Sequence, residues 1–169
     1  MISLSRIRLA AAFVAGTFAL ATPHAVRAQD SGLAIGTTAP SATLQTLDGK
    51  TVDLAKIAKG PAVIEFWATW CENCKELEPS LLSLVKQYQG KVTFVGVAVS
   101  VNQSSARVKN YAAQHGMTHV ILFDGKGAAT EAYDVPATSY VVIVNKAGKV
   151  VYTGVGGDQD LAAAIKKGL

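Results

Sequence analysis

Both cysteines of this 169-residue chain lie in one short stretch, FWATWCENC at residues 66–74. Two residues separate Cys71 from Cys74, and this spacing lets two thiols close and open a small disulfide ring. At the start of a helix, the first thiol would lie beside unpaired backbone N–H groups and the positive end of the helix dipole, which favour the thiolate. We therefore interpret Cys71 as an exposed nucleophile and Cys74 as a more buried resolving thiol.

Two other uses of the pair are a structural disulfide and a metal site. A ring closed across two residues removes little chain entropy from the unfolded state, so it would stabilise the fold poorly. Two soft thiolates could bind Cu(I) in an exported copper carrier, with a histidine as a further ligand. Past residue 30 the chain has only His115 and His119, which we expect at a helix end and in a loop, as solvated side chains. We expect no metal and no cofactor.

A carboxylate interrupts the apolar stretch VIEFW before the cysteines. Strand alternation places Glu65 on the same face as Trp67 and Thr69. Burial raises the pKa of a carboxyl group, which suits proton exchange near neutral pH. We expect Glu65 to accept a proton from Cys74 and to return it, and the alternative is an exposed or lysine-paired carboxylate.

Strands and helices that would position these residues alternate along the chain. We expect strands at 61–68, 91–101 and 120–123, helices at 77–88, 104–115, 128–133 and 158–167, and hairpins that turn at 48–49 and 146–148. This order predicts an α/β fold with a mixed sheet and helices on both faces. Cys71 then follows the carboxyl end of a central strand, where open α/β sheets place their chemistry.

The first 28 residues are typical of a secretory signal peptide. Two arginines precede an apolar run at 9–21, and Val-Arg-Ala at 26–28 offers a cleavage site. We expect cleavage after Ala28 and export to the periplasm, and a retained membrane anchor is the alternative, although the run is short for a span. Three of the 16 basic residues would leave with this leader, so 13 would remain against 12 acidic residues. That balance argues against a nucleic-acid surface.

The stretches around the cysteines also resemble a known family. FWATWCENC, an acid six residues before the first cysteine, and VPATSYVVIV followed by NKAGKVV are similar to the thioredoxin fold. The preceding GTTAPSATLQTLDGKTVDLAKIAKG narrows the resemblance to exported thiol:disulfide oxidoreductases of the TlpA/ResA/DsbE-like group, which carry such an N-terminal hairpin. The resemblance covers about residues 36–168. It implies a thioredoxin-like domain, placed at 39–169 after a flexible lead-in at 29–38.

This resemblance implies an activity and partners. Trp70 would cover the cysteines, Glu72 and Asn73 would belong to the substrate-binding surface, and the backbone around Val135 would pair with a bound chain. Members of the group commonly reduce exported proteins, often serve cytochrome c maturation and receive electrons from a membrane thiol reductant. We therefore expect a monomer whose partners are disulfide-bearing exported proteins, apocytochrome c among them.

Two positions depart from the family pattern. Many relatives have an acid six residues after the first cysteine, where this chain has Leu77. Its neighbours Glu76 and Glu78 would point in different directions on a helix, so the role would fall to Glu65.

The second departure concerns a proline. Pro136 is a candidate cis-proline, with a trans bond as the alternative. The family's proline should stand nearer Thr138 or Ser139, so either the strand is longer here or the cis-proline is absent.

The residues between the cysteines bear on the direction of electron transfer. Strong oxidants owe their potential to a very stable thiolate, commonly aided by a histidine between the cysteines. Glu72 instead places a negative charge beside Cys71, which predicts a reducing or intermediate couple. A peroxiredoxin-like peroxidase is a further alternative, but it would need a threonine three residues before its reactive cysteine, where Ala68 stands.

Overall fold

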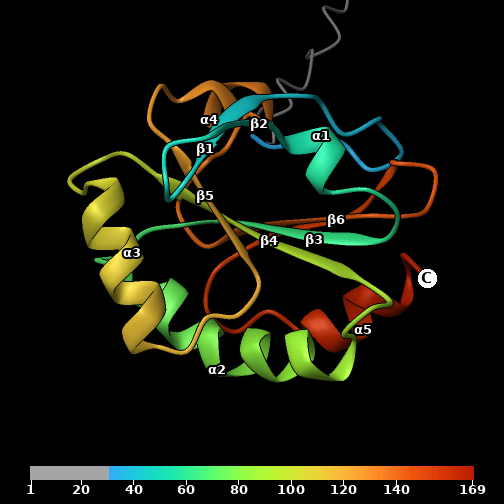
Figure 1. Cartoon of the computed structure of the whole chain (residues 1–169). Coiled ribbons are helices and arrows are strands. Elements are labelled where there is room, and N and C mark those ends of the chain that lie inside the picture. The colour runs from blue at the N-terminus through green and yellow to red at the C-terminus, as the bar shows by residue number, and fades with distance from the viewer. Residues whose placement is uncertain (1–30) are drawn as a thin grey trace, which may run out of the picture. The chain divides into compact units, whose positions relative to one another are not determined.

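A seven-stranded mixed sheet forms the centre of the domain in the computed structural model, which describes residues 31–169 (Figure 1). The expected signal peptide lies outside these residues. The strand order is β2-β1-β5-β4-β3-β6-β7, with β3, β4 and β5 parallel and the other pairs antiparallel. The strands are β1 Thr43–Thr46, β2 Thr51–Asp53, β3 Ala62–Trp67, β4 Thr93–Val99, β5 Val120–Asp124, β6 Tyr140–Val144 and β7 Val150–Val155.

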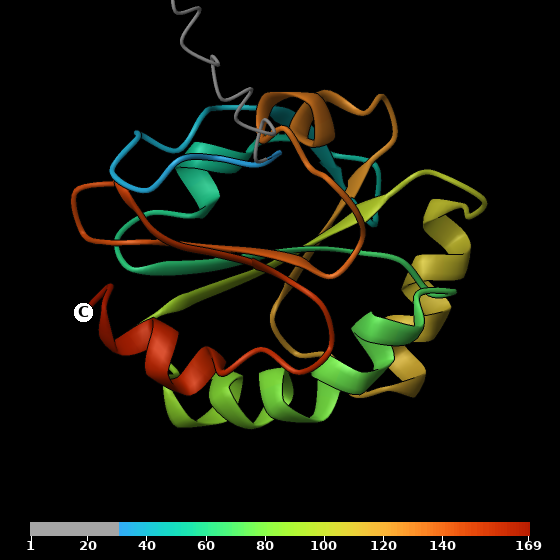
Figure 2. The ribbon, with the colours of Figure 1, turned by 180° about the vertical axis from the view of Figure 1, so that it is seen from behind.

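Five helices accompany the sheet. They are α1 Leu54–Ile57, α2 Glu72–Gln87, α3 Ser105–Gln114, α4 Ala128–Ala132 and α5 Leu161–Lys166. Figures 1 and 2 show α1 and α4 on one side of the sheet and α2 and α5 on the other. The expected mixed α/β architecture with helices on both faces is therefore confirmed, while the one-turn helix α1 was not predicted.

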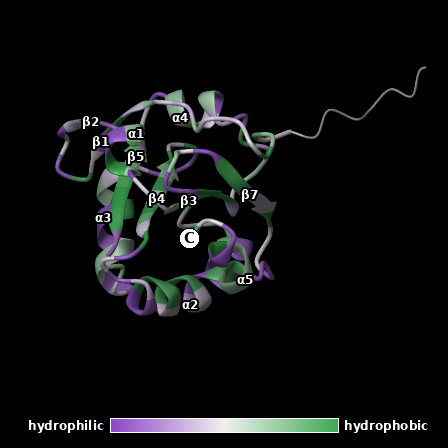
Figure 3. Ribbon diagram, turned by 90° about the vertical axis from the view of Figure 1, so that its right-hand side faces the viewer, coloured by the Kyte–Doolittle hydropathy of each residue, from purple (hydrophilic) through white to green (hydrophobic). Residues whose placement is uncertain are grey.

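The central strand β3 is hydrophobic on both faces because helices cover both. All six of its residues are buried. Ile64 and Phe66 join the core layer that contains α1 and α4, whereas Val63 packs with the leucines of α2 and with α5. In α2 those leucines recur as Leu77, Leu81 and Leu84, a stripe with helical spacing. Figure 3 shows the hydrophobic strands inside and the mixed faces of α2 and α5 outside.

The segment before β1 is attached to the β6–β7 hairpin. The Gly36 N–H donates to the Val150 carbonyl at 2.8 Å, and the Val150 N–H donates to the Thr37 carbonyl at 2.9 Å. Gly36 and Thr37, which belong to the expected flexible lead-in at 29–38, therefore have backbone partners in the domain.

Candidate functional site

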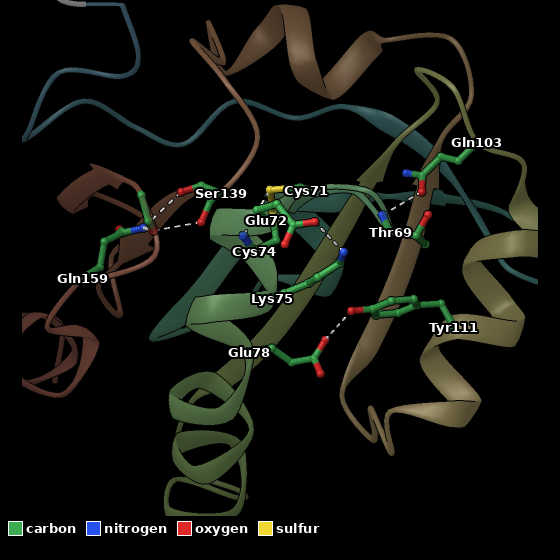
Figure 4. The surroundings of a disulfide bond; sticks show 11 residues. Thr69, Cys71, Glu72, Cys74, Lys75, Glu78, Gln103, Tyr111, Ser139 and Gln159 are labelled. Atoms are coloured by element: carbon green, nitrogen blue, oxygen red, sulfur yellow. Dashed lines mark hydrogen bonds and ion pairs between the residues drawn. A yellow bond between two sulfur atoms is a disulfide. The ribbon is translucent and has the colours of Figure 1, made fainter.

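Cys71 and Cys74 form a disulfide where β3 passes into α2 (Figure 4). Cys71 is the N-cap residue of this 16-residue helix, and its Sγ accepts a hydrogen bond from the Cys74 N–H at 3.1 Å. An N–H of the first helical turn thus points at the Cys71 sulfur, as the sequence predicted from its place after the strand. The same contact would stabilise a Cys71 thiolate after reduction.

Burial does not distinguish the two cysteines. Each is 5% exposed, so the expectation that Cys71 is exposed and Cys74 is more buried is not met in the disulfide form. The reason is that the N-cap position folds Cys71 back over the first turn of α2. The two thiols differ instead in their relation to the helix terminus, because only the Cys71 sulfur caps it.

Glu65 lies in the middle of β3 and is 4% exposed. Burial, and secondly the negative charge of Glu78, raise the pKa of Glu65 from 4.5 to about 8. Its neighbour across the sheet is Gly96 of β4. A Cβ at Gly96 would lie 2.9 Å from the Trp67 Nε1 and 3.4 Å from the His119 Nε2. The missing side chain therefore leaves room for two nitrogen-bearing rings beside the buried carboxyl group.

Several polar atoms on this face of the sheet lack a protein partner. Within residues 31–169 the buried Trp67 Nε1, Thr69 Oγ1 and His119 Nδ1 make no hydrogen bond. Burial also lowers the pKa of His119 to about 4, so this ring is neutral near pH 7. The expectation that His119 is solvated was wrong. It lies two residues before the buried Ile121, and the period of an extended chain turns both side chains to the same face.

The carboxylate of Glu78 on α2 contacts two side chains of the α3 region, Tyr111 and His115. Its Oε2 accepts a hydrogen bond from the Tyr111 hydroxyl at 3.1 Å, and its Oε1 pairs with the His115 Nδ1 at 2.7 Å. The rings of Tyr111 and His115 stack with centroids 3.7 Å apart. Burial and the carboxylate of Glu78 raise the pKa of Tyr111 to about 12. His115, expected to be solvated, is 37% exposed and forms an ion pair with Glu78 when protonated.

The three residues at 76–78 point in different directions on α2, as the helix period requires. Leu77 is 1% exposed and belongs to the core. Glu78 faces α3, whereas Glu76 lies against Gly157, where an added Cβ would lie 2.6 Å from the Glu76 Cδ.

The bond before Pro136 has the trans form, which was the alternative to the candidate cis-proline. Residues 31–169 contain no cis peptide bond, so Val135–Pro136 is trans and the candidate cis-proline is absent there. Val135 donates its N–H to the Thr130 carbonyl at 3.0 Å, and so this donor cannot pair with a partner chain. The cause is the end of α4: left-handed Asp134 (φ +46°) and Val135 close it with the two hydrogen bonds of a Schellman motif.

Ser139 occupies the place in front of β6 where the family's proline was expected. It is fully buried and left-handed (φ +63°), and its N–H donates to the Phe66 carbonyl near the end of β3 at 2.8 Å. Figure 4 shows it among the residues around the disulfide, together with Gln159. Sequence reasoning located this position but offered no sign of Gln159.

An apolar groove of about 380 Å³ lies next to the turn that precedes Cys71. Trp70, which is 39% exposed, lines it and donates its Nε1–H to the Val101 carbonyl at 2.8 Å. The other lining residues are Val99, Ser100, Val101, Gly127, Thr130, Glu131, Val135, Ala137 and Thr138. The groove is therefore an accessible apolar surface that begins at the residue before Cys71.

A second contact fixes the loop that carries Trp70. The Thr69 N–H donates to the Gln103 Oε1 at 2.9 Å (Figure 4). The Gln103 Nε2–H in turn donates to the Val99 carbonyl at 2.5 Å. Gln103 thus ties the turn before Cys71 to the end of β4.

The two residues between the cysteines are exposed. The Glu72 side chain is 83% exposed and forms a 2.7 Å ion pair with Lys75, one turn along α2. Lys75 offsets part of the negative charge that Glu72 brings to Cys71. Asn73 also faces solvent. The repulsion expected from Glu72 is accordingly weaker than its charge alone suggests.

Among residues 31–169, no three histidine, cysteine, aspartate or glutamate side chains converge to hold a metal ion. None of the helices there has the length and apolar character that crossing a bilayer requires.

Comparisons with known proteins agree with this geometry. Residues 34–166 match the model of the Redoxin family. The chain is 30% identical over 128 residues to the thiol-disulfide oxidoreductase ResA of Bacillus subtilis, covering 76% of this chain and 71% of that protein. It is also 30% identical over 123 residues to the thioredoxin-like protein YneN of the same organism, covering 72% of each.

Solved structures show the same fold. A thioredoxin-family thiol:disulfide interchange protein of Chlorobium tepidum is 26% identical, with a TM-score of 0.68 over 80% of this chain and 97% of that one. A secreted disulfide oxidoreductase of Mycobacterium tuberculosis, described as homologous to DsbE, is 26% identical with a TM-score of 0.64 over 73% of this chain and 93% of that one.

Proposed function

Because the chain belongs to the Redoxin family, as a thiol-disulfide oxidoreductase of the ResA/DsbE-like group, we propose that it reduces disulfides of exported partner proteins. The observation that carries the proposal is the Cys71–Cys74 disulfide at the start of α2, which follows the strand that holds the buried Glu65 and comes directly after Trp70, a residue that lines an apolar groove. The enzyme class follows from the family, whereas the direction and the partner are the proposal.

The exchange conserves electrons between the two proteins. In the reduced enzyme the Cys71 thiolate attacks one sulfur of a partner disulfide, which forms a mixed disulfide and releases a partner thiolate. The Cys74 thiolate then attacks the Cys71 sulfur. The enzyme disulfide forms, the second partner sulfur leaves as a thiolate, and two electrons have passed to the partner.

Glu65 supplies the proton balance of these steps. With a pKa of about 8 in the disulfide form, it is mostly a neutral acid at pH 7. It can therefore give a proton to Cys74 when an upstream reductant opens the disulfide. In the resolving step it takes that proton back and frees the Cys74 thiolate.

The surroundings favour a reducing couple. No cation lies between the cysteines, where the sequence has Glu72 and Asn73. The burial of both sulfurs disfavours a stable thiolate, and the dithiol form is a strong reductant when its thiolate is not stabilised. The N-terminus of α2 acts in the opposite direction, because it favours the Cys71 thiolate. We therefore place the reduction potential of the couple between that of thioredoxin and intermediate values.

The groove supports a protein as the partner. It presents an apolar surface beside Cys71, suited to an extended segment next to the partner's cysteine. An exported monomer, cleaved after Ala28 and kept reduced by a membrane thiol reductant, would meet such partners in the periplasm. Apocytochrome c is one candidate among them.

Insulin reduction tests the proposal. The wild type should accelerate the reduction of insulin by dithiothreitol, and Cys71→Ser should abolish this. Cys74→Ser should instead accumulate a mixed disulfide with an exported partner, visible as a band that dithiothreitol removes. An active Cys71→Ser variant would refute the assignment of the nucleophile. Stoichiometric Cu(I) binding without insulin reduction would favour the copper carrier, and rapid peroxide consumption would favour the peroxidase.

A further inference from the structure

The turn that faces the cysteines has an unusual backbone. Ser139 is fully buried, yet its φ is +63°, a conformation that L-residues with a Cβ rarely adopt. Such a backbone persists only where its surroundings hold it. The contacts that hold Ser139 are therefore informative about what the turn does.

All hydrogen-bonding groups of Ser139 are engaged. Its N–H donates to the Phe66 carbonyl at 2.8 Å, and its hydroxyl donates to the Gly156 carbonyl at 2.8 Å. Its own carbonyl accepts from the Gly156 N–H at 3.2 Å and from the Gln159 Nε2–H at 3.0 Å.

Gln159 joins the two sides of this turn. Its Nε2 donates to the Gly156 carbonyl at 2.7 Å as well as to Ser139, and its Oε1 accepts from the Tyr152 hydroxyl at 3.1 Å. Gly154 leaves room for this side chain, since a Cβ there would lie 2.6 Å from the Gln159 Oε1. The amide therefore uses both of its ends within a site shaped around it.

The residue before Ser139 is in the opposite situation. Thr138 lines the same groove as Trp70, and within residues 31–169 neither its N–H nor its carbonyl has a protein partner. Because Ser139 is fixed, the unpaired N–H and carbonyl of Thr138, which we call the Thr138 backbone edge, are held next to Trp70, the residue that precedes Cys71. A mobile turn would present that edge in many orientations.

We propose that Gln159 is a positioning residue for thiol–disulfide exchange: it holds the left-handed turn at Ser139, and through it the Thr138 backbone edge, in register with Cys71. Gln159 does not touch the reacting sulfurs. This role rests on the proposed reduction of partner proteins, because a small disulfide needs no backbone edge to reach Cys71.

Steady-state reduction of insulin by Gln159→Leu tests this role. Leucine keeps the volume and removes the hydrogen bonds, so the KM for insulin should rise about fivefold to tenfold while kcat changes less than about twofold. The rate with oxidised glutathione and the reduction potential should stay at the wild-type values. Gln114→Leu, on the exposed end of α3, is the matched control and should leave all four quantities unchanged.

A rescue separates positioning from loss of folding. Glycine adopts a positive φ without strain, so adding Ser139→Gly to Gln159→Leu should recover part of the lost KM. Thermal unfolding will show that each variant is folded at the assay temperature. An insulin KM within twofold of the wild type in Gln159→Leu, or an equal loss with oxidised glutathione, would overturn the positioning role. A wild type that never reduces insulin would instead overturn the proposed function.

Discussion

The buried carboxyl group of Glu65 should make the stability of the protein depend on pH. Glu65 is 4% exposed, and its pKa is raised from 4.5 to about 8 by burial and by Glu78. Between these two pH values the folded protein keeps a proton that the unfolded chain releases. The free energy of unfolding must therefore fall as the pH rises through this window.

The magnitude follows from the size of the displacement. Each pKa unit corresponds to about 1.4 kcal/mol, so the change from 4.5 to about 8 corresponds to about 5 kcal/mol at full ionisation. The stability that the neutral form confers is complete below pH 4.5 and is lost as the pH rises to about 8. Glu65→Gln has no proton to lose, so its stability should lack this component.

Urea denaturation of the oxidised protein measures the difference. Wild type and Glu65→Gln should be unfolded at pH 5, 6, 7, 8 and 9, because all other titrating groups are common to both. Between pH 5 and pH 9 the free energy of unfolding of Glu65→Gln should rise by several kcal/mol relative to that of the wild type, mostly above pH 6. Parallel pH profiles for the two proteins would refute the assignment of a neutral, buried carboxyl group at this position.

Three further predictions concern the neighbours of this group. Glu78→Gln removes the charge that helps raise the pKa of Glu65, so the midpoint of the pH–rate profile for partner release should move to lower pH, by about one unit or less. An unmoved midpoint would exclude an effect of the Glu78 charge on Glu65. Relative to His119→Asn, the wild type should lose up to about 3 kcal/mol of unfolding free energy as the pH falls from 6.5 to 4, because burial disfavours protonation of His119; urea titrations of the two proteins would show this difference. Gln103→Ala leaves the Thr69 N–H without its acceptor and should cost about 1–2 kcal/mol in urea unfolding, against no change for Gln114→Ala.

The sequence predicted features that depend on local pattern. The apolar run before Cys71 is the central strand β3, and Ser104 and His115 cap α3 as the expected helix bounds indicated. The buried position of Glu65 also followed from the pattern, since a carboxylate in a strand covered on both sides has no exposed face.

Features that depend on contacts between distant segments were not predicted. His119 is half-buried because Gly96, on the neighbouring strand, leaves room for its ring, and a single strand does not reveal its neighbour. The Schellman motif that uses the Val135 N–H is local, but Asp134 gives only a weak sign of a left-handed residue. Gln159 contacts Ser139 across 20 residues through side-chain geometry, which has no periodic signature.

The reduction potential of the Cys71–Cys74 couple is the most direct test of the account. The oxidised protein should be equilibrated with defined ratios of reduced to oxidised dithiothreitol or glutathione and quenched with an alkylating reagent. Mass spectrometry then counts the free thiols. We expect one two-electron transition at or below about −180 mV, towards the thioredoxin value of about −270 mV. A couple near about −120 mV, the range of strong disulfide oxidants, would contradict electron donation to partners.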